Sequence, residues 1–375
     1  MRIGYSYWGF LGDVKLAEDG SVLSTPDGNA TYSWSIIWEL QRRGHTVYAM
    51  QEDRDWPAYR RLGEGLFASF SNEKRASAYQ NMKQTFGSSE ILPELDVLLV
   101  EWRFAIPGRN CDEHPFRRGP SWAGSKPVLT FDPAKHQPDF FRQMEIMRHY
   151  AEKNTKIVVW DLDHKLTEAQ EKHWKMDAIF ETSHSPRLLS KPRTRVEPPF
   201  HIPDLLQHPT LPSDPNRKLV YIGSRYERDD VIDEWLGPVS AKYPGQVEFH
   251  GKWDDEAKAR WPNISMHQRC TVTDFRRIYG SAGACPLLAK KSYLETGFIT
   301  PRPWEAILFG TIPVGLGSMK GIDQYTTMVA GDPDDLVDIT EVLCDTDQRD
   351  AGRRYIAEML DFMDAKHFAD KLEAV

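Results

Sequence analysis

Two aspartates stand at the end of an apolar, strand-like segment in the first half of the chain. In "VVWDLDHK", residues 158–165, Asp161 and Asp163 are two positions apart, so a strand points both side chains the same way. A carboxylate at the mouth of a cleft can accept the proton of an attacking hydroxyl. The string also fits a DxD metal-binding pattern. The alternative is one functional or capping aspartate beside a solvated one.

Glycine, serine and arginines follow a second strand-like segment, in "VYIGSRYER", residues 220–228. Gly223 lets backbone N–H groups approach an anion, and Ser224 can hydrogen-bond phosphate. Arg225 and Arg228 add charge just before a helical segment, whose N-terminus favours an anion. The alternative is an ordinary strand-to-helix turn with solvated arginines.

A stiff corner occurs in "FITPRPWEAILFG", residues 298–310. Pro303 suits the first turn of a helix, which places Arg302 at the helix entrance and Glu305 one turn later. The arginine can pair with a diphosphate, and the carboxylate can accept both hydrogens of a ribose diol. A structural Arg-Glu pair at a helix start is the alternative.

Two further segments could contact a nucleotide or a nucleic acid. In "VEFHGKW", a strand that ends in His250 and Gly251 could offer backbone groups to a nucleobase, or could be a buried strand followed by a glycine turn. Residues 103–126 mix basic and aromatic side chains in a long loop, a combination that suits phosphate contact and base stacking. A solvated surface loop is the alternative. The candidate contacts in this loop are Arg103, Arg109, Arg117, Arg118 and Trp122.

Apolar strand-like segments alternate with helical ones along the whole chain, which predicts parallel sheets covered on both faces. The proline-rich stretch at 200–218 is the best linker candidate. We therefore expect a first, acceptor-binding domain over 1–200, rejoined by a C-terminal helix at 350–375. A second, nucleotide-sugar domain is expected over 217–349.

Size and composition limit the class of protein. At 375 residues two domains are expected, and 40% apolar with 27% charged residues is typical of globular proteins. A net charge of −8 argues against a general polyanion binder, although a local basic patch can hold a phosphate backbone. The sequence shows neither a signal peptide nor a membrane span. The cysteines lack metal-ligand spacing, so we expect reduced thiols in a cytoplasm. We also expect no metal site and a monomer.

Together, "VYIGS", "VEFHG" and "FITPRPWE" resemble, in order and spacing, motifs of the T-even-type phage DNA β-glucosyltransferases. The resemblance covers most of the chain and is strongest in the second half. It implies an α/β, GT-B-like fold with two Rossmann-like domains facing each other across a cleft. It also implies glucose transfer from UDP-glucose to 5-hydroxymethylcytosine in double-stranded DNA, in the host cytoplasm if a phage encodes the chain.

The resemblance also implies roles for single residues. Asp163 corresponds to the catalytic aspartate, with Asp161 as the fallback. The modified pyrimidine should flip out of the duplex to react. Mg²⁺ or Mn²⁺ could assist the departure of UDP. The implied donor contacts are Ser224 with Arg225 or Arg228 for phosphate, His250 and Gly251 for uracil, Arg302 for the diphosphate and Glu305 for ribose.

Three departures from the family pattern leave parts of this expectation open. Ile222 stands where the family has a second glycine. In the donor-sugar and acceptor region, near "PDGNATY", the family has an acidic residue, and Asn29 is the sequence position nearest to it. This change leaves the identity of the sugar open. The loop at 103–126 is longer than the family's, which leaves the acceptor context open. A glycosyltransferase for surface glycans or metabolites, and a non-catalytic DNA-binding or nucleotide-sugar-sensing protein, are the alternatives.

Overall fold

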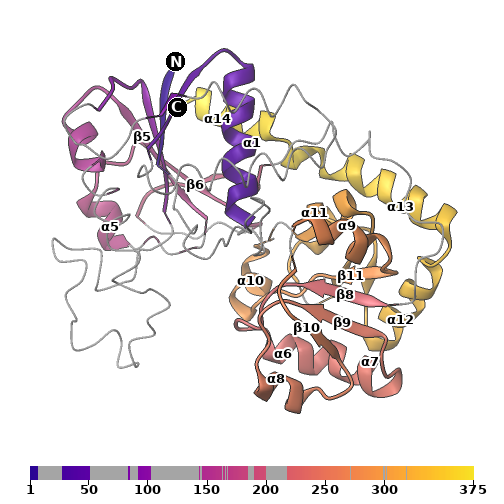
Figure 1. Cartoon of the computed structure of the whole chain (residues 1–375). Helices are drawn as coiled ribbons and strands as arrows, with labels where there is room; N and C mark the ends of the chain where they lie inside the picture. Colours follow the sequence, from indigo (N-terminus) through magenta and orange to yellow (C-terminus); the bar gives the residue numbers. More distant parts are fainter. Residues whose placement is uncertain are drawn as a thin grey trace, which may run out of the picture.

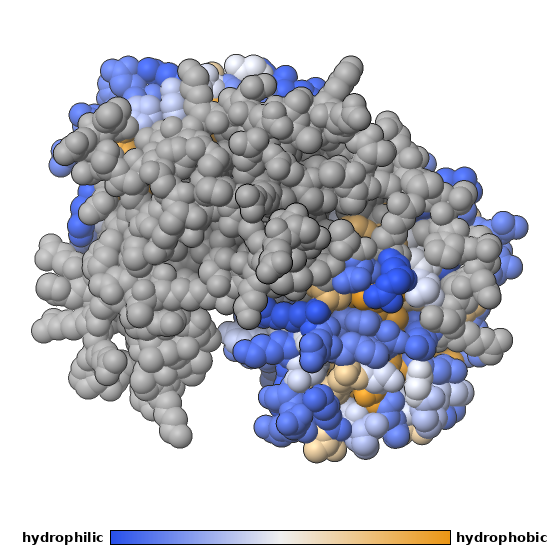
Figure 2. Space-filling model, in the orientation of Figure 1, coloured by the Kyte–Doolittle hydropathy of each residue, from blue (hydrophilic) through white to orange (hydrophobic). Residues whose placement is uncertain are grey.

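Buried apolar strands alternate with helices and form two parallel sheets, one in each domain (Figure 1). The computed structural model describes residues 1–6, 28–50, 83–84, 92–102, 143, 146–162, 164, 166, 168–184, 190–199, 218–270, 272–298, 300, 302–317 and 319–375. Most of the described surface visible in Figure 2 is hydrophilic, with a few apolar side chains between the polar ones.

The first sheet has seven parallel strands in the order β3-β2-β1-β4-β5-β6-β7, the order of a Rossmann sheet with one added strand. Helix α1 ends just before Gly44, whose φ of 85° is a left-handed conformation that glycine adopts without strain. Residues 146–151 are also helical. The elements are β1 (Arg2–Ser6), α1 (Gly28–Arg42), β2 (Thr46–Ala49), β3 (Lys83–Gln84), β4 (Val97–Glu101), β5 (Lys156–Asp161), α5 (Glu168–His173), β6 (Ala178–Glu181) and β7 (Thr194–Arg195).

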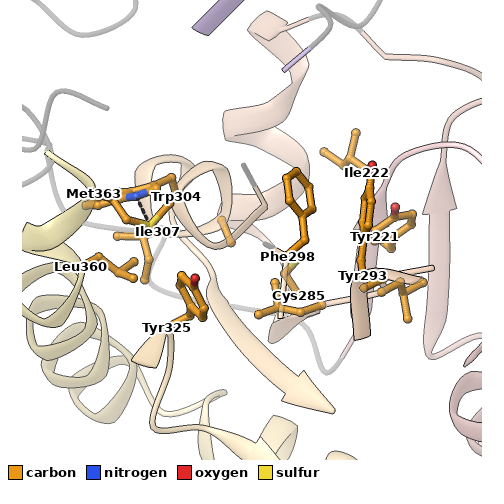
Figure 3. Close-up of a cluster of buried hydrophobic side chains, with 14 of the residues drawn as sticks. Tyr221, Ile222, Cys285, Tyr293, Phe298, Trp304, Ile307, Tyr325, Leu360 and Met363 are labelled. Atoms are coloured by element: carbon orange, nitrogen blue, oxygen red, sulfur yellow. Dashed lines mark hydrogen bonds between the residues drawn. The ribbon is translucent and has the colours of Figure 1, made fainter. Parts of the chain in front are cut away.

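The second sheet has six parallel strands in the order β10-β9-β8-β11-β12-β13, so its strand order reverses between β8 and β11. Figure 3 shows side chains from its strands and helices filling the core of this domain. The strands are β8 (Leu219–Ile222), β9 (Val247–His250), β10 (Ser265–His267), β11 (Ala284–Pro286), β12 (Ile312–Leu316) and β13 (Val329–Ala330). The helical elements are α6 (Asp229–Val231), the π-helical η4 (Ile232–Leu236), α7 (Gly237–Lys242), α8 (Asp255–Arg260), α9 (Val272–Gly280), α10 (Lys291–Thr296), α11 (Arg302–Phe309), the 3-10 turn η5 (Ile322–Gln324) and α12 (Pro333–Val342).

The C-terminal segment packs on both domains. It consists of α13 (Thr346–Met359), the 3-10 turn η6 (Leu360–Met363) and α14 (Ala365–Glu373). Helix α13 lies on the second domain, where Arg353 donates to the carbonyl of Ile307 at 3.0 Å. Helix α14 lies against α1, and its Phe368 ring is 5.0 Å from that of Trp160 in the first sheet (Figure 1).

The carboxyl ends of the first sheet meet the second domain. After β6, the backbone N–H of His184 donates to the carbonyl of Gly297 at 3.3 Å. After β5, the His164 ring lies 5.3 Å from that of Phe298. Both partners precede α11, so the loops that follow β5 and β6 contact the segment leading into that helix. Ligands of such sheets bind at the carboxyl ends of the strands, where these contacts lie.

Candidate functional site

The turn after β8 lies directly against the turn after β9. Gly223 N–H donates to the carbonyl of His250 at 2.8 Å. A Cβ on Gly251 would stand 1.9 Å from the carbonyl oxygen of Gly223, a distance that no side chain tolerates. Glycine at position 251 is therefore required for the two strand ends to approach. This brings together Gly223, His250 and Gly251, three of the predicted nucleotide contacts.

Arg225 belongs to an ion-pair network. Its guanidinium donates to Asp229 at 2.6 and 2.9 Å, to Asp254 at 2.9 Å and to Glu256 at 2.9 Å. These bonds, that to Asp229 foremost, raise the pKa of Arg225 above its usual value. Because its hydrogens are directed at these carboxylates, Arg225 fits a structural role better than a phosphate contact.

Arg228 has different surroundings. It donates to the backbone carbonyls of Tyr226 at 2.8 Å, Ser224 at 3.3 Å and Leu288 at 3.3 Å. In the described part of the chain no carboxylate forms an ion pair with Arg228. Leu288 follows β11 and Ser224 follows β8, so Arg228 bridges the two strands between which the strand order reverses. That is the usual ligand position in a doubly wound sheet.

Helix α11 begins at Arg302, as the Pro-Arg-Pro corner predicts, and presents an ion pair. Arg302 pairs with Glu305, three residues on, and Glu305 is 8% exposed. Burial opposes the charge of Arg302, but the Glu305 carboxylate together with Tyr279, Tyr221 and Cys285 raises the pKa of the arginine. Trp304 fixes this turn from the core side, donating from Nε1 to Met363 Sδ at 2.8 Å (Figure 3).

Arg228 and Arg302 meet at one aromatic ring. The Arg302 guanidinium carbon lies 5.7 Å from the ring centroid of Tyr221, and that of Arg228 lies 5.8 Å from it. The negative face of an aromatic ring attracts cations. Of the two arginines, only Arg302 is paired with a carboxylate among the described residues. Two guanidinium groups therefore lie at the Tyr221 ring with one paired carboxylate between them, an arrangement that suits an anion such as a diphosphate.

Sequence reasoning missed two features beside this turn. Trp253 is buried, and its Nε1 lies 3.3 Å from where a Gly251 Cβ would stand. Among the described residues this N–H has no hydrogen-bond partner, so a ligand acceptor there would satisfy it. Glu248 binds His250 at 2.7 Å and Lys218 at 2.6 Å, and these bonds lower the pKa of Glu248 to about 2. Nothing in the motif "VEFHG" indicated that Glu248 would be ionised and hydrogen-bonded to both His250 and Lys218.

The first-domain candidates are described only in part. Asp161 is fully buried, and its carboxylate accepts the backbone N–H of Leu166 at 3.1 Å, which braces the loop after β5. Between Asp161 and Leu166, His164 has a φ of 56°, a left-handed conformation that is uncommon outside glycine. Asn29 is in the first turn of α1. The predicted base Asp163 and the loop candidates Arg103, Arg109, Arg117, Arg118 and Trp122 lie outside the described residues.

Other side chains at the carboxyl ends of the first sheet were also missed. Glu101 ends β4 fully buried and accepts a hydrogen bond from the Tyr5 hydroxyl at 3.3 Å. Glu181 ends β6 and accepts a hydrogen bond from Arg193 at 2.7 Å. Single glutamates at strand ends form no motif, so the sequence did not indicate that these side chains would be buried. The contacts with Tyr5 and Arg193 are those of structural groups.

The described cysteines are free thiols. Cys270 and Cys285 are buried, which raises the pKa of each to about 12 and keeps both protonated. Cys344 is partly buried, and the fourth cysteine lies outside the described residues. Across the described ranges, no helix has the length and apolar character needed to span a bilayer.

Comparison with known proteins bears on the fold. No protein-family model matches the sequence, and no curated protein matches it. Solved structures do match over the whole chain. An alpha-glucosyltransferase in complex with UDP-glucose and abasic DNA is 12% identical, with a TM-score of 0.56 over 100% of this chain and 98% of its own. T4 phage beta-glucosyltransferase with UDP and Mn²⁺ is 14% identical, with a TM-score of 0.52 over 99% of both chains.

This chain has the two-domain GT-B fold. The HepE protein of Anabaena, in complex with UDP and glucose, also matches, at 11% identity and a TM-score of 0.51 over 100% of both chains. The predicted fold class, two Rossmann-like α/β domains, is therefore confirmed. The resemblance seen in the sequence motifs is supported at the level of this fold.

Proposed function

We propose that the chain is an inverting glycosyltransferase that moves a sugar, in the first place glucose, from a UDP-sugar to a hydroxymethylated pyrimidine in double-stranded DNA. The observation that carries this proposal is the convergence of Arg228 and Arg302 on Tyr221, at the point where the second sheet reverses its strand order. A diphosphate is the anion that this charge suits in a GT-B fold. The matched structures that hold UDP or UDP-glucose support the same ligand.

The donor would extend along the carboxyl edge of the second sheet. Arg302 and Arg228 would hold the diphosphate together with Ser224, while His250 and Gly251 would meet the base. Glu305 would accept hydrogen bonds from ribose while remaining beside Arg302. Among the two arginines left open by the sequence, Arg228 fills the phosphate role because Arg225 is already paired with three carboxylates.

The reaction needs a base, because a free alcohol is a weak nucleophile at neutral pH. Asp163 would accept the proton of the hydroxymethyl group as its oxygen attacks the anomeric carbon. The bond from that carbon to UDP breaks on the opposite face, which inverts the configuration. The charge that grows on the departing diphosphate would be stabilised by the two arginines. A divalent cation such as Mg²⁺ or Mn²⁺ could share this charge.

The acceptor proposal rests on the sequence motifs and on relatives of the same fold. Two alpha-glucosyltransferase structures with this fold contain DNA, and in one of them the DNA contains a HMU base. Residues 103–126 would supply phosphate contacts and stacking surfaces, and the modified base would flip out of the duplex to react. HepE and a Thermobaculum terrenum O-GlcNAc transferase share the fold at TM-scores of 0.51 and 0.52, so transfer to a glycan, metabolite or protein is the second candidate.

One assay separates these functions. Duplexes containing 5-hydroxymethylcytosine, 5-hydroxymethyluracil or unmodified cytosine are incubated with a panel of UDP-sugars, and the digested nucleosides are identified by mass. We expect a hexosyl adduct on a hydroxymethylated base alone, and NMR of the isolated nucleoside should show the β configuration. UDP-sugar hydrolysis without DNA modification would favour the second candidate. The absence of any UDP binding would favour a non-catalytic protein.

Arg228→Ala and Arg225→Ala are expected to separate binding from stability. Loss of Arg228 should weaken UDP-sugar binding by about 10- to 100-fold, the equivalent of one or two charge-assisted hydrogen bonds. Loss of Arg225 should lower the melting temperature instead, because it removes the cation shared by Asp254, Glu256 and Asp229, of which Asp229 keeps only Arg260 among the described residues. Titration calorimetry and thermal unfolding of both variants test this. The opposite pattern would return the phosphate role to Arg225.

A further inference from the structure

Three side chains on neighbouring strands of the second sheet direct donor atoms at one another. Glu248 and His250 are two residues apart on β9, and His267 on β10 is in register with His250. Glu248 Oε1 lies 2.7 Å from His250 Nε2 and 3.5 Å from His267 Nε2. One ligand atom of each residue lies within 4.8 Å of the other two. The parallel pairing of β9 and β10 thus brings this trio together.

We propose that Glu248, His250 and His267 form an open binding site for a borderline-soft transition-metal ion such as Zn²⁺ or Co²⁺. Two imidazoles and one carboxylate are a common donor set for such ions, with further positions left for water. Donors of a tetrahedral ion with bonds of about 2.0–2.1 Å lie roughly 3.3 Å apart. The observed separations of 2.7 and 3.5 Å are close to this value. Mg²⁺ prefers oxygen ligands and fits poorly.

The carboxylate is already oriented for this role. Lys218 Nζ lies 2.6 Å from Oε2 of Glu248, which leaves Oε1 facing the two imidazoles. Such outer contacts fix the direction of metal ligands and are part of a site's affinity. The simpler explanation is a hydrogen-bonded trio at the edge of the sheet, in which His267 contributes little because its contact is the longer one.

Metal binding requires one side chain to turn. The rings of His250 and His267 are stacked, with centroids 4.6 Å apart and planes 16° apart, so the two imidazoles lie face to face and do not both point at one ion. His267 can rotate, since its side chain is 48% exposed, whereas those of Glu248 and His250 are 15% and 10% exposed. His267 would therefore close over an ion that enters from solvent, while the other two ligands stay in place.

Occupation of this site would affect the nucleotide, a consequence that rests on the proposed function. The strand end at His250 and Gly251 is the proposed contact of the UDP base, and a Zn²⁺ ion on the His250 imidazole, with its bound water, would lie beside that base. Zn²⁺ and UDP are therefore expected to oppose each other. This is distinct from a Mg²⁺ or Mn²⁺ ion at the diphosphate, which would act together with the nucleotide.

Cobalt titration of untagged protein tests the site directly. Wild type should develop the visible absorption of Co²⁺ bound to nitrogen and oxygen ligands, and excess Zn²⁺ should abolish it. His267→Ala should lower Co²⁺ affinity by more than the roughly 10- to 100-fold that loss of an outer contact costs. His173→Ala, which removes an exposed histidine on α5 of the first domain, is the matched control and should bind Co²⁺ as wild type does. Equal affinity in wild type and His267→Ala would overturn the proposal, as would the absence of binding in wild type.

A second measurement tests the link to the nucleotide. Saturating Zn²⁺ should weaken UDP binding to wild type by roughly tenfold or more, while Mg²⁺ should not. In His267→Ala, UDP affinity should match wild type and be insensitive to Zn²⁺. The same Zn²⁺ effect in wild type and variant would overturn the link. If UDP fails to bind at all, the proposed function falls, whereas the metal site still stands or falls on the cobalt titration.

Discussion

Replacing Arg302 with alanine is expected to lower kcat/KM for UDP-sugar transfer by about 10²- to 10³-fold, the loss typical of removing one preorganised donor from developing charge. Arg302 and Arg228 lie at 5.7 and 5.8 Å from the same Tyr221 ring, so removal of one leaves the other to hold the diphosphate alone. Because the charge on the diphosphate grows as the sugar departs, kcat should fall more than KM rises. Steady-state kinetics with UDP titration measures both.

The ion pair with Glu305 requires a control for stability. Glu305 is 8% exposed, and a buried ion pair that loses one partner can cost about 3–5 kcal/mol of folding stability. Arg302→Lys keeps a positive charge beside Glu305 but cannot offer a planar pair of donors to two phosphate oxygens. It should melt near wild type and still lose activity. If both variants transfer sugar at wild-type rates once their folded fractions are considered, Arg302 is a structural residue.

The fold was largely readable from the sequence because its strands are short, apolar and separated by helices. β4, β5 and β8 are buried along nearly their whole length, so each gave an uninterrupted apolar segment. The start of α11 at Arg302 was also predictable, since Pro303 has no N–H to lose in the first turn of a helix. Local backbone chemistry thus determined where these elements begin and end.

The side-chain partners were not readable, because they join segments far apart in sequence. Arg225 and Arg228 are equivalent in the string "GSRYER", and only the placement of α8 pairs Arg225 with Asp254 and Glu256. Strand β10 has only three residues and a polar composition, so His267 could not be placed beside His250. Nothing in "VEFHGKW" indicated that the N–H of Trp253 would be buried next to Gly251.

The two halves of the proposed site are joined through the loop after β5. His164 lies one residue beyond the predicted base, and its ring contacts Phe298 and Tyr293 of the second domain at 5.3 and 6.4 Å. Its Nε2 lies 3.1 Å from the carbonyl of Thr182, and its φ is 56°. Backbone strain of this kind persists only where surrounding contacts enforce it. The position of the base loop is thus coupled to the segment that leads into Arg302.

Asp163, the predicted catalytic base, lies in this loop of the sequence, directly before His164. Asp163→Asn should lower kcat by about 10²- to 10⁴-fold, since an amide cannot accept the proton of the attacking hydroxyl. UDP affinity and melting temperature should remain near wild type, because the proposed nucleotide contacts lie in the second domain. Single-turnover transfer to 5-hydroxymethylcytosine DNA measures the chemical step, and calorimetry measures UDP binding.

Asp161→Asn is the matched comparison, because it makes the same chemical change two residues away. Asp161 is fully buried and accepts the N–H of Leu166, a bond that the amide oxygen of asparagine can also accept. Its rate should therefore fall far less than that of Asp163→Asn. Asp161→Ala leaves that N–H without its acceptor and should cost about 1–3 kcal/mol of stability. If Asp161→Asn instead abolishes transfer with an unchanged melting temperature while Asp163→Asn remains active, the base is Asp161, and the hydrogen bond to Leu166 serves to orient it.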